Sequence, residues 1–200
     1  MAVTHHHSTT EGVVTGAPTQ STGFRRALAT LRIAYGITFL WAFLDKAFAL
    51  GFHTGAITDP ETGARTGIDF FAKDQAWFNG GNPTEGFLMF GVPADNPFKS
   101  MFNGMAGDTW VNWLFMLGLL GIGVALLAGV VMRIATAAGA LMYAVMYAAV
   151  VPLENNPVVD DHLVGVIVMI VLALGAAGTT WGLGHWWNNT EAVKKNPVLR

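Results

Sequence analysis

Four long apolar segments alternate with polar connections along the chain. They cover about residues 27–52, 110–132, 134–151 and 157–183. Each is close to the roughly 20 residues that a helix needs to cross a bilayer core of about 30 Å. Arg133 marks a tight turn between the second and third segments, and Pro152 ends the third. The pattern predicts an all-α integral membrane protein with four transmembrane helices packed as a bundle.

The connection over residues 53–108 is hydrophilic on average, yet aromatic residues recur along it. Four of its residues fall at helical spacing, namely Ile68, Phe71, Gln75 and Phe78. Two helix-start signals follow, Asn82-Pro83-Thr84-Glu85 and Asn96-Pro97, in which asparagine caps the first turn and proline fits it. Long connections with buriable aromatics usually have a function. We therefore expect an outer lid of short amphipathic interfacial helices.

The two ends of the chain are polar and differ in composition from the middle. Residues 1–23 are rich in Thr, Ser and Gly and predict a disordered tail. The tract His5 to His7 within it is interpreted as incidental rather than as a metal site. Residues 24–187 are expected to form one membrane domain, and residues 188–200 a second tail. A small-residue stripe at Gly121, Ala125 and Gly129 is expected to admit a neighbouring helix.

The composition agrees with a membrane protein and excludes several functions. Hydrophobic residues make up 52% and charged residues 12% of the chain, whereas about a quarter of a soluble domain is charged. A net charge of −2 leaves no basic footprint for nucleic acid. The chain has no cysteine, which excludes disulfides, thiol nucleophiles and cysteine-ligated iron–sulfur clusters.

Ionisable residues gather where two of the expected spans reach one side of the membrane. Asn156-Pro157 predicts the start of the fourth helix, so Asp160, Asp161 and His162 would occupy its first turns. Asp45 and Lys46 lie within the first span at a similar expected depth. Ionisable side chains inside a membrane are functional candidates by default.

Two interpretations of this cluster remain open at the level of sequence. In the first, Asp45 or Lys46 forms an ion pair with the segment Asp160 to His162 and locks the bundle. In the second, these residues form a polar pocket beneath the lid that binds a carbonyl headgroup. His162 would then carry protons, because imidazole changes charge near neutral pH, and Asp45 or Asp161 would orient it. Further contacts to the bound group are expected from Trp41, Lys46, Asp160 and Arg32, although Arg32 also suits a topological anchor in the headgroups.

Basic residues predict the orientation, and histidine positions argue against haem. The residues Arg25, Arg26, Arg133, Lys194 and Lys195 fall on one side if there are four spans. That side is expected to be cytoplasmic, with both termini inside and the lid outside. His162 and His185 bracket the fourth span, so they lie too far apart to share one haem. No haem, iron–sulfur cluster or metal site is expected.

Several short motifs follow one another along residues 25–187. They are Leu31 to Gly36, Phe39-Leu40-Trp41 and Asp45-Lys46 in the first span, Asn82 to Leu88 in the lid, Gly118 to Gly129 before Arg133, and Asn156 to His162. Their order resembles the DoxX/DoxD family of small four-helix bacterial membrane proteins. The resemblance implies a four-helix fold in the bacterial plasma membrane and a pocket for a membrane quinone.

The resemblance also implies a reaction, because DoxD-like members are the large subunit of thiosulfate:quinone oxidoreductase. That enzyme joins two thiosulfates to tetrathionate and reduces a quinone. Acidic residues outnumber basic ones in the connection 53–108, and such a surface repels a dianion. Thiosulfate would therefore need a basic partner subunit. The alternative function is a non-catalytic accessory subunit of a larger respiratory or redox membrane complex.

Overall fold

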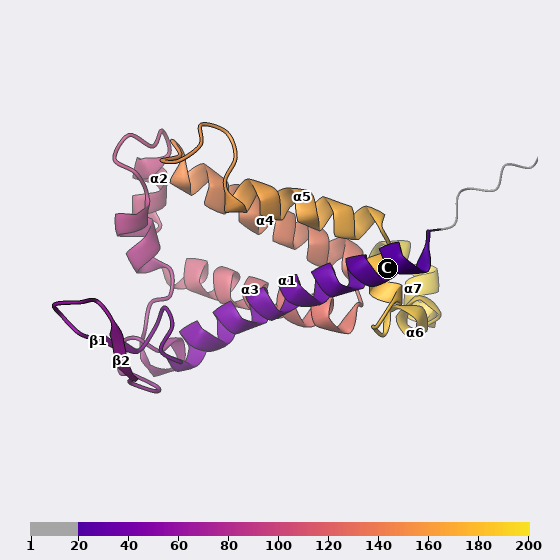
Figure 1. Ribbon diagram of the computed structural model, residues 1–200, viewed down its shortest axis with the longest axis horizontal. Coiled ribbons are helices and arrows are strands. Elements are labelled where there is room, and N and C mark those ends of the chain that lie inside the picture. Colours follow the sequence, from indigo (N-terminus) through magenta and orange to yellow (C-terminus); the bar gives the residue numbers. More distant parts are fainter. Residues whose placement is uncertain (1–19) are drawn as a thin grey trace, which may run out of the picture.

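The computed structural model describes residues 20–200, which are mostly helical (Figure 1). The tract His5 to His7 lies outside the described residues. Four helices form the body of the protein: α1 (Thr22–Phe48), α3 (Thr109–Ala128), α4 (Met132–Val150) and α5 (Asp161–Leu174). Three of them, α1, α3 and α4, are long and apolar enough to cross a membrane. The chain is therefore a helical membrane protein.

The first helix is shifted toward the N-terminus relative to the predicted span. Ser21 caps it by accepting a hydrogen bond from the Phe24 amide at 3.2 Å, so the helix includes residues that were expected in the tail. It ends at Phe48 rather than near residue 52, because Ala49 adopts a left-handed conformation with φ of 54°. The predicted bounds of α3 and α4 are within a few residues of the observed ones.

The fourth helix is much shorter than predicted. Asn156 does not start it; its side chain accepts hydrogen bonds from the amides of Val158 and Val159 and closes a turn. The N-cap is Asp160, whose carboxylate accepts from the Leu163 amide at 2.9 Å. The 14 residues of α5 extend about 21 Å at 1.5 Å each, less than a bilayer core. Four complete spans are thus not observed.

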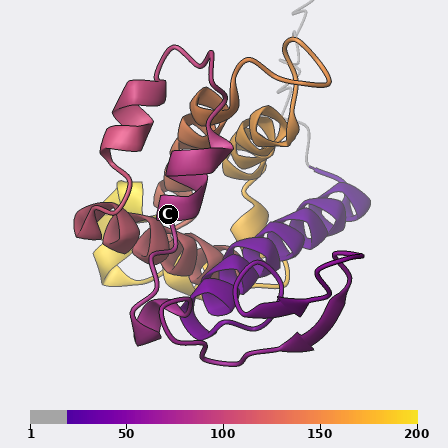
Figure 2. The same cartoon turned by 90° about the vertical axis from the view of Figure 1, so that its left-hand side faces the viewer.

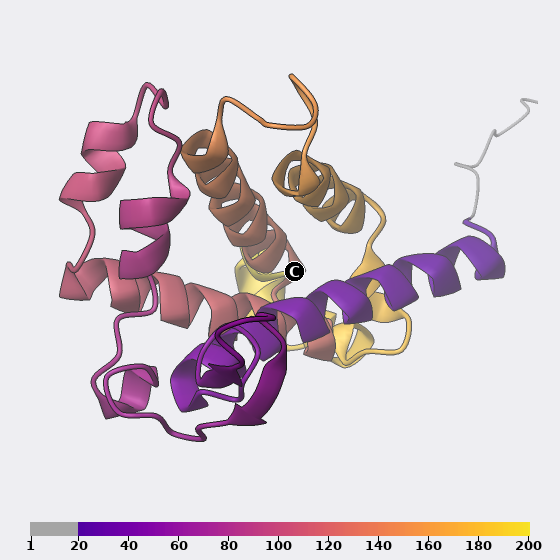
Figure 3. The ribbon, with the colours of Figure 1, turned by 60° about the vertical axis from the view of Figure 1, so that its left-hand side comes forward.

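The helices pack as two pairs, α1 with α3 and α4 with α5, which meet mainly through α3 and α4 (Figure 3). Close approach within the first pair depends on Gly36 and Gly123. A Cβ on Gly123 would lie 2.7 Å from the Leu40 backbone nitrogen, and one on Gly36 would lie 2.9 Å from the Leu127 side chain. The expected contact at Gly121 is wrong, because Gly121 faces open space.

The connection between α1 and α3 is ordered but is only partly helical. It contains the antiparallel strands β1 (Ala56–Thr58) and β2 (Arg65–Ile68), the short helices η1 (Trp77–Asn79) and η2 (Phe87–Gly91), and α2 (Lys99–Gly104). The amphipathic helix expected over residues 68–78 is absent, because Phe71 and Asp74 both have a φ of 59°, which a helix cannot accommodate. Figure 2 views the molecule from the end of the bundle that carries the lid, residues 53–108.

The end of the chain packs against the opposite end of the bundle instead of forming a tail. Residues 175–183, expected as helix, include the short η3 (Ala177–Thr179), and α6 (Gly184–Asn188), α7 (Glu191–Lys195) and η4 (Pro197–Leu199) follow. The Trp187 indole donates to the Leu199 carbonyl at 2.6 Å, and the Arg133 amide donates to the Arg200 carbonyl at 2.8 Å. Val193 is fully buried. The start of α1 lies at this same end (Figure 1).

Candidate functional site

A pocket of about 690 Å³ lies between the lid and the neighbouring ends of α1, α3 and α4. Its volume is typical of sites for small organic ligands. Polar lining comes from Lys46, His53, Thr54, Asp74, Gln75, Asn82 and Thr84, and apolar lining from Pro83, Gly86, Phe87, Leu88, Phe102, Met105, Val111, Phe115, Val145, Met146 and Ala149. The pocket therefore has polar groups from the end of α1 and the first part of the lid, and a larger apolar wall.

A carboxylate in the last turn of α1 positions His53, one of the polar groups of the pocket. Asp45 is 1% exposed, and its two oxygens accept hydrogen bonds from the amides of Phe52 and His53 at 3.0 and 2.9 Å. These bonds fix the chain reversal after the helix and place His53 at the pocket. Gln75 holds the same loop by accepting from the Gly55 amide at 3.1 Å. Asp45 is thus a positioning residue for the pocket.

Lys46 is the cation of this site. It is half-buried in the last turn of α1 and lines the pocket. Within residues 20–200 its ammonium makes neither a hydrogen bond nor an ion pair, and the ion pairs formed there are His162 with Asp160 and Lys194 with Glu191. A half-buried ammonium without an anionic partner retains its full capacity to donate hydrogen bonds. It can therefore stabilise negative charge on a bound group.

Two buried asparagines fasten the lid over the pocket. The Asn112 side chain of α3 accepts hydrogen bonds from the amide and the hydroxyl of Thr84, at 3.2 and 2.7 Å. Asn96 donates to the carbonyls of Ala148, Ala149 and Val151 at the end of α4. These contacts tie the lid to both helices that form the apolar wall.

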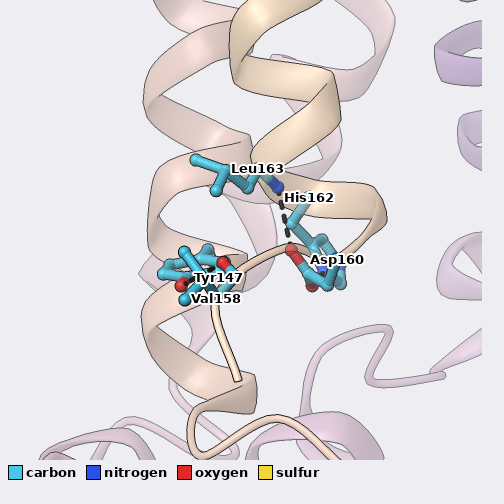
Figure 4. A network of polar contacts seen from close by, with 5 residues as sticks. All are labelled: Tyr147, Val158, Asp160, His162 and Leu163. Carbon is cyan, nitrogen blue, oxygen red and sulfur yellow. Dashed lines mark hydrogen bonds and ion pairs between the residues drawn. The ribbon is translucent and has the colours of Figure 1, made fainter. Parts of the chain in front are cut away.

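The Asp160 to His162 segment forms a separate site. The carboxylate of Asp160 accepts from the Leu163 amide and pairs with His162 Nδ1 at 2.5 Å, and Tyr147 donates to the Val158 carbonyl nearby (Figure 4). Partial burial acts to raise the pKa of Asp160, which precedes α5, but the hydrogen bonds from Leu163 and His162 outweigh it and hold that pKa below its ordinary value. Asp160 is therefore a carboxylate that caps the helix and fixes the imidazole.

An aromatic contact extends this second site into the bundle. The His162 ring meets Tyr143 of α4 at 6.4 Å between centroids, and Tyr143 in turn meets Tyr35 of α1 at 6.2 Å. Gly165 makes room for the tyrosine, since a Cβ there would lie 2.7 Å from the Tyr143 ring. The arrangement joins α1, α4 and α5 at this level.

The predicted single cluster is therefore divided between different places, and Lys46 is its one member that lines the pocket. Asp45 binds loop amides and does not pair with Lys46 or with the Asp160 to His162 segment. Replacing Asp45 and Lys46 together by apolar residues, which an ion-paired lock would tolerate, would leave two amides without their acceptor. Asp161 is exposed at the start of α5.

Two more predicted contacts lie away from the pocket. Trp41 is 42% exposed, and its ring packs edge-on against Phe52 at 5.1 Å between centroids. Arg32 is fully buried at the other end of the bundle. Its guanidinium donates to the carbonyls of Leu126, Leu127, Thr180 and Trp181, so it is neither a headgroup anchor nor a contact of the pocket.

Sequence reasoning missed most of the residues that line or fasten the pocket. His53 and Asn112 belong to no recognisable motif, and the helical spacing that includes Gln75 predicted a helix that is absent. Their roles depend on hydrogen bonds to residues that the sequence does not pair with them. The dipeptide Asn96-Pro97 was recognised as a helix start, with Asn96 as the residue that caps the helix. The amide instead reaches α4, and its oxygen accepts from the Phe98 amide at 2.7 Å.

Comparisons with protein-family models, with curated proteins and with solved structures found no match. Within residues 20–200, no three His, Asp or Glu side chains gather to hold a metal ion.

Proposed function

We propose that the pocket beneath the lid binds the headgroup of a membrane quinone, and that the chain is the membrane subunit of a quinone-linked oxidoreductase. The observation that carries this proposal is the Lys46 ammonium, which lines a largely apolar pocket without an anionic partner in the described part of the chain. The resemblance to the DoxX/DoxD family points to the same ligand.

The chemistry of a quinone matches the two parts of the pocket. Its ring carries carbonyl oxygens that accept hydrogen bonds, and Lys46 and His53 can supply them. Its ring faces and apolar tail suit side chains such as Phe87, Phe115 and Met146. An ammonium beside the carbonyl also favours reduction, because negative charge develops on that oxygen.

Reduction of the quinone to quinol takes two electrons and two protons. His53 is exposed at the loop that borders the pocket, so its imidazole can pass protons from water to a quinone oxygen. The electrons come from a donor oxidised on a partner subunit. We further propose, from the resemblance to the DoxD-like members, that this donor is thiosulfate. Two thiosulfates then give one tetrathionate and the two electrons that the quinone takes up.

The orientation and location belong to the same proposal. The start of α1 and the C-terminal segment share one end of the bundle (Figure 1), where Arg25, Arg26, Arg133, Lys194 and Lys195 lie. The positive-inside rule then places that end in the cytoplasm and the pocket at the outer face of a bacterial plasma membrane.

Replacing Lys46 by glutamine is expected to lower the quinone content of the purified protein about tenfold, because the charge-assisted hydrogen bond to the carbonyl is lost. Quinone is extracted from protein purified in mild detergent and quantified against protein. Lys73→Gln is the matched control, since Lys73 is exposed on the lid and does not line the pocket. Equal quinone in wild type and both variants, or none in any of them, would contradict the proposal.

The alternative of a non-catalytic accessory subunit is favoured by the outer surface of the lid. Phe70, Phe90, Phe98 and Met101 are between 48% and 86% exposed there, and large exposed apolar surface is typical of contacts with protein or lipid. Purification without dissociating partners separates the two functions. The accessory function requires a stable larger assembly in which the quinone site belongs to another subunit.

A further inference from the structure

A second cavity, of about 350 Å³, lies at the end of the bundle opposite the lid. The turn between α3 and α4, the end of α5, the segment η3 to α6 and Arg200 form it. Backbones meet closely at its base: a Cβ on Gly184 would lie 2.5 Å from the Gly178 carbonyl oxygen and 2.6 Å from that of Gly129. These glycines therefore allow the turn between α3 and α4 to pack closely against the C-terminal segment at the base of the cavity.

The side chains around this cavity are positively charged. Arg133 and Arg200 line it, and no Asp or Glu side chain does. Arg133 makes one side-chain hydrogen bond in the described residues, to the Pro197 carbonyl at 3.0 Å, and the Arg200 side chain makes none there. Glu191, the acid in the adjoining α7, is paired with Lys194 at 3.0 Å. Two guanidinium groups that retain free donors suit a phosphate group.

The rest of the lining indicates that the anion carries an acyl chain. Met132, Ala173 and Leu174 make one side of the cavity apolar, and Leu174, at the end of α5, is 82% exposed. Trp181 and Trp186, at the same end of the chain, are 59% and 63% exposed. Exposed tryptophans are typical of the headgroup level of a membrane, which is where a phospholipid phosphate lies.

We infer that this cavity binds the phosphate of an anionic phospholipid from the cytoplasmic leaflet. Arg133 and Arg200 hold the phosphate, and the surface around Leu174 receives the acyl chain. The site is independent of the proposed quinone pocket, since the two cavities lie at opposite ends of the bundle and share no residue.

The test measures lipid binding by the full chain in detergent, with any affinity tag at the N-terminus so that Arg200 is unaltered. Native mass spectrometry gives the apparent Kd for phosphatidylglycerol and for zwitterionic phosphatidylcholine. Arg200→Gln is expected to weaken phosphatidylglycerol binding about tenfold, because one charge-assisted contact is lost. The fold is retained, since only the backbone carbonyl of Arg200 bonds to the bundle. Arg133→Gln is the second variant, with the same expected direction.

The control variant is Lys195→Gln, which removes one positive charge at the same end of the chain without touching the cavity. Its phosphatidylglycerol Kd should stay within about twofold of wild type, because exposed charges contribute little. Unchanged binding in both arginine variants, or equal binding of the two lipids, would overturn the inference. Displacement of phosphatidylglycerol by an equal concentration of inorganic phosphate would identify a free-anion site and overturn the lipid assignment.

Discussion

Replacing Arg32 by leucine is expected to destabilise the bundle by about 3–5 kcal/mol, because several carbonyls lose their donor and each buried carbonyl left without one costs about 1–3 kcal/mol. For a chain of this size that corresponds to a fall in melting temperature of roughly 10 °C or more. Arg32 is fully buried, yet its guanidinium pairs with no carboxylate in the described residues. Its partners are backbone carbonyls.

The physical reason lies at the end of α3. The last four carbonyls of a helix have no partner within it. Here the amides of Gly129 and Val130 bond to Ala125, and the Leu183 amide bonds to Ala128. The Gly129 amide also reaches the Leu126 carbonyl at 3.2 Å, and Arg32 donates to the carbonyls of Leu126 and Leu127. Leucine would leave the Leu127 carbonyl buried without a donor and Leu126 with the Gly129 amide alone, and it would remove a cation from the negative end of the helix dipole.

Thermal unfolding in detergent, followed by tryptophan fluorescence, measures this effect. The matched control is Arg26→Leu, because Arg26 is exposed on the same helix and its guanidinium makes no hydrogen bond in the described residues. Arg32→Lys should recover part of the loss, since one ammonium reaches fewer carbonyls than a guanidinium. A melting temperature of Arg32→Leu within about two degrees of wild type would show that these bonds do not hold the end of the bundle together.

Asn96→Ala is expected to loosen the lid, with a loss of about 2–3 kcal/mol in stability and about a tenfold fall in bound quinone, equivalent to about 1.4 kcal/mol. The side chain is 5% exposed. The Asn96 side-chain nitrogen donates to three carbonyls at the end of α4, and its side-chain oxygen accepts from the Phe98 amide before α2. Both α2 and α4 supply walls of the pocket. Removing the Asn96 side chain therefore removes a connection between these two walls.

Melting temperature and quinone content are measured on the same preparation of this variant. Asn103→Ala is the control within the lid, because that amide makes one backbone hydrogen bond, to Met89 at 3.3 Å. The control is expected to retain its quinone. If Asn96→Ala lost stability but kept its full quinone content, the lid would not be a wall of the binding site.

Hydropathy was sufficient to find the membrane helices that have a full apolar length. It placed α3 and α4 closely, because an apolar run of about 20 residues matches the thickness of a bilayer core and exceeds most buried helices of soluble proteins. It failed at α5 for a local reason. Asn156-Pro157 has the composition of a helix start, but the asparagine side chain bonds to the amides of Val158 and Val159 and makes a turn. Asp160 competes for the same role and provides the cap.

The site was harder to predict than the helices. The sequence indicates how deep in the membrane an ionisable side chain lies, but it does not indicate which group that side chain will bond to. Asp45 and His162 were expected to meet, since both were placed near one face of the membrane. The loop after α1 instead folds back and presents its amides to Asp45 within a few residues, while His162 bonds to its neighbour Asp160. Local partners satisfied both groups, which leaves Lys46 to face the pocket.

The proposed quinone site is tested most directly by locating a bound quinone within the chain. A photoactivatable azidoquinone is added to the purified protein, illuminated, and mapped by peptide mass spectrometry. We predict labels on pocket residues from the lid and α4, such as Phe87, Met105 and Met146, and their loss when excess unmodified quinone is present. Labels concentrated around His162 and Tyr143, or labels that excess quinone does not remove, would contradict the assignment of the pocket.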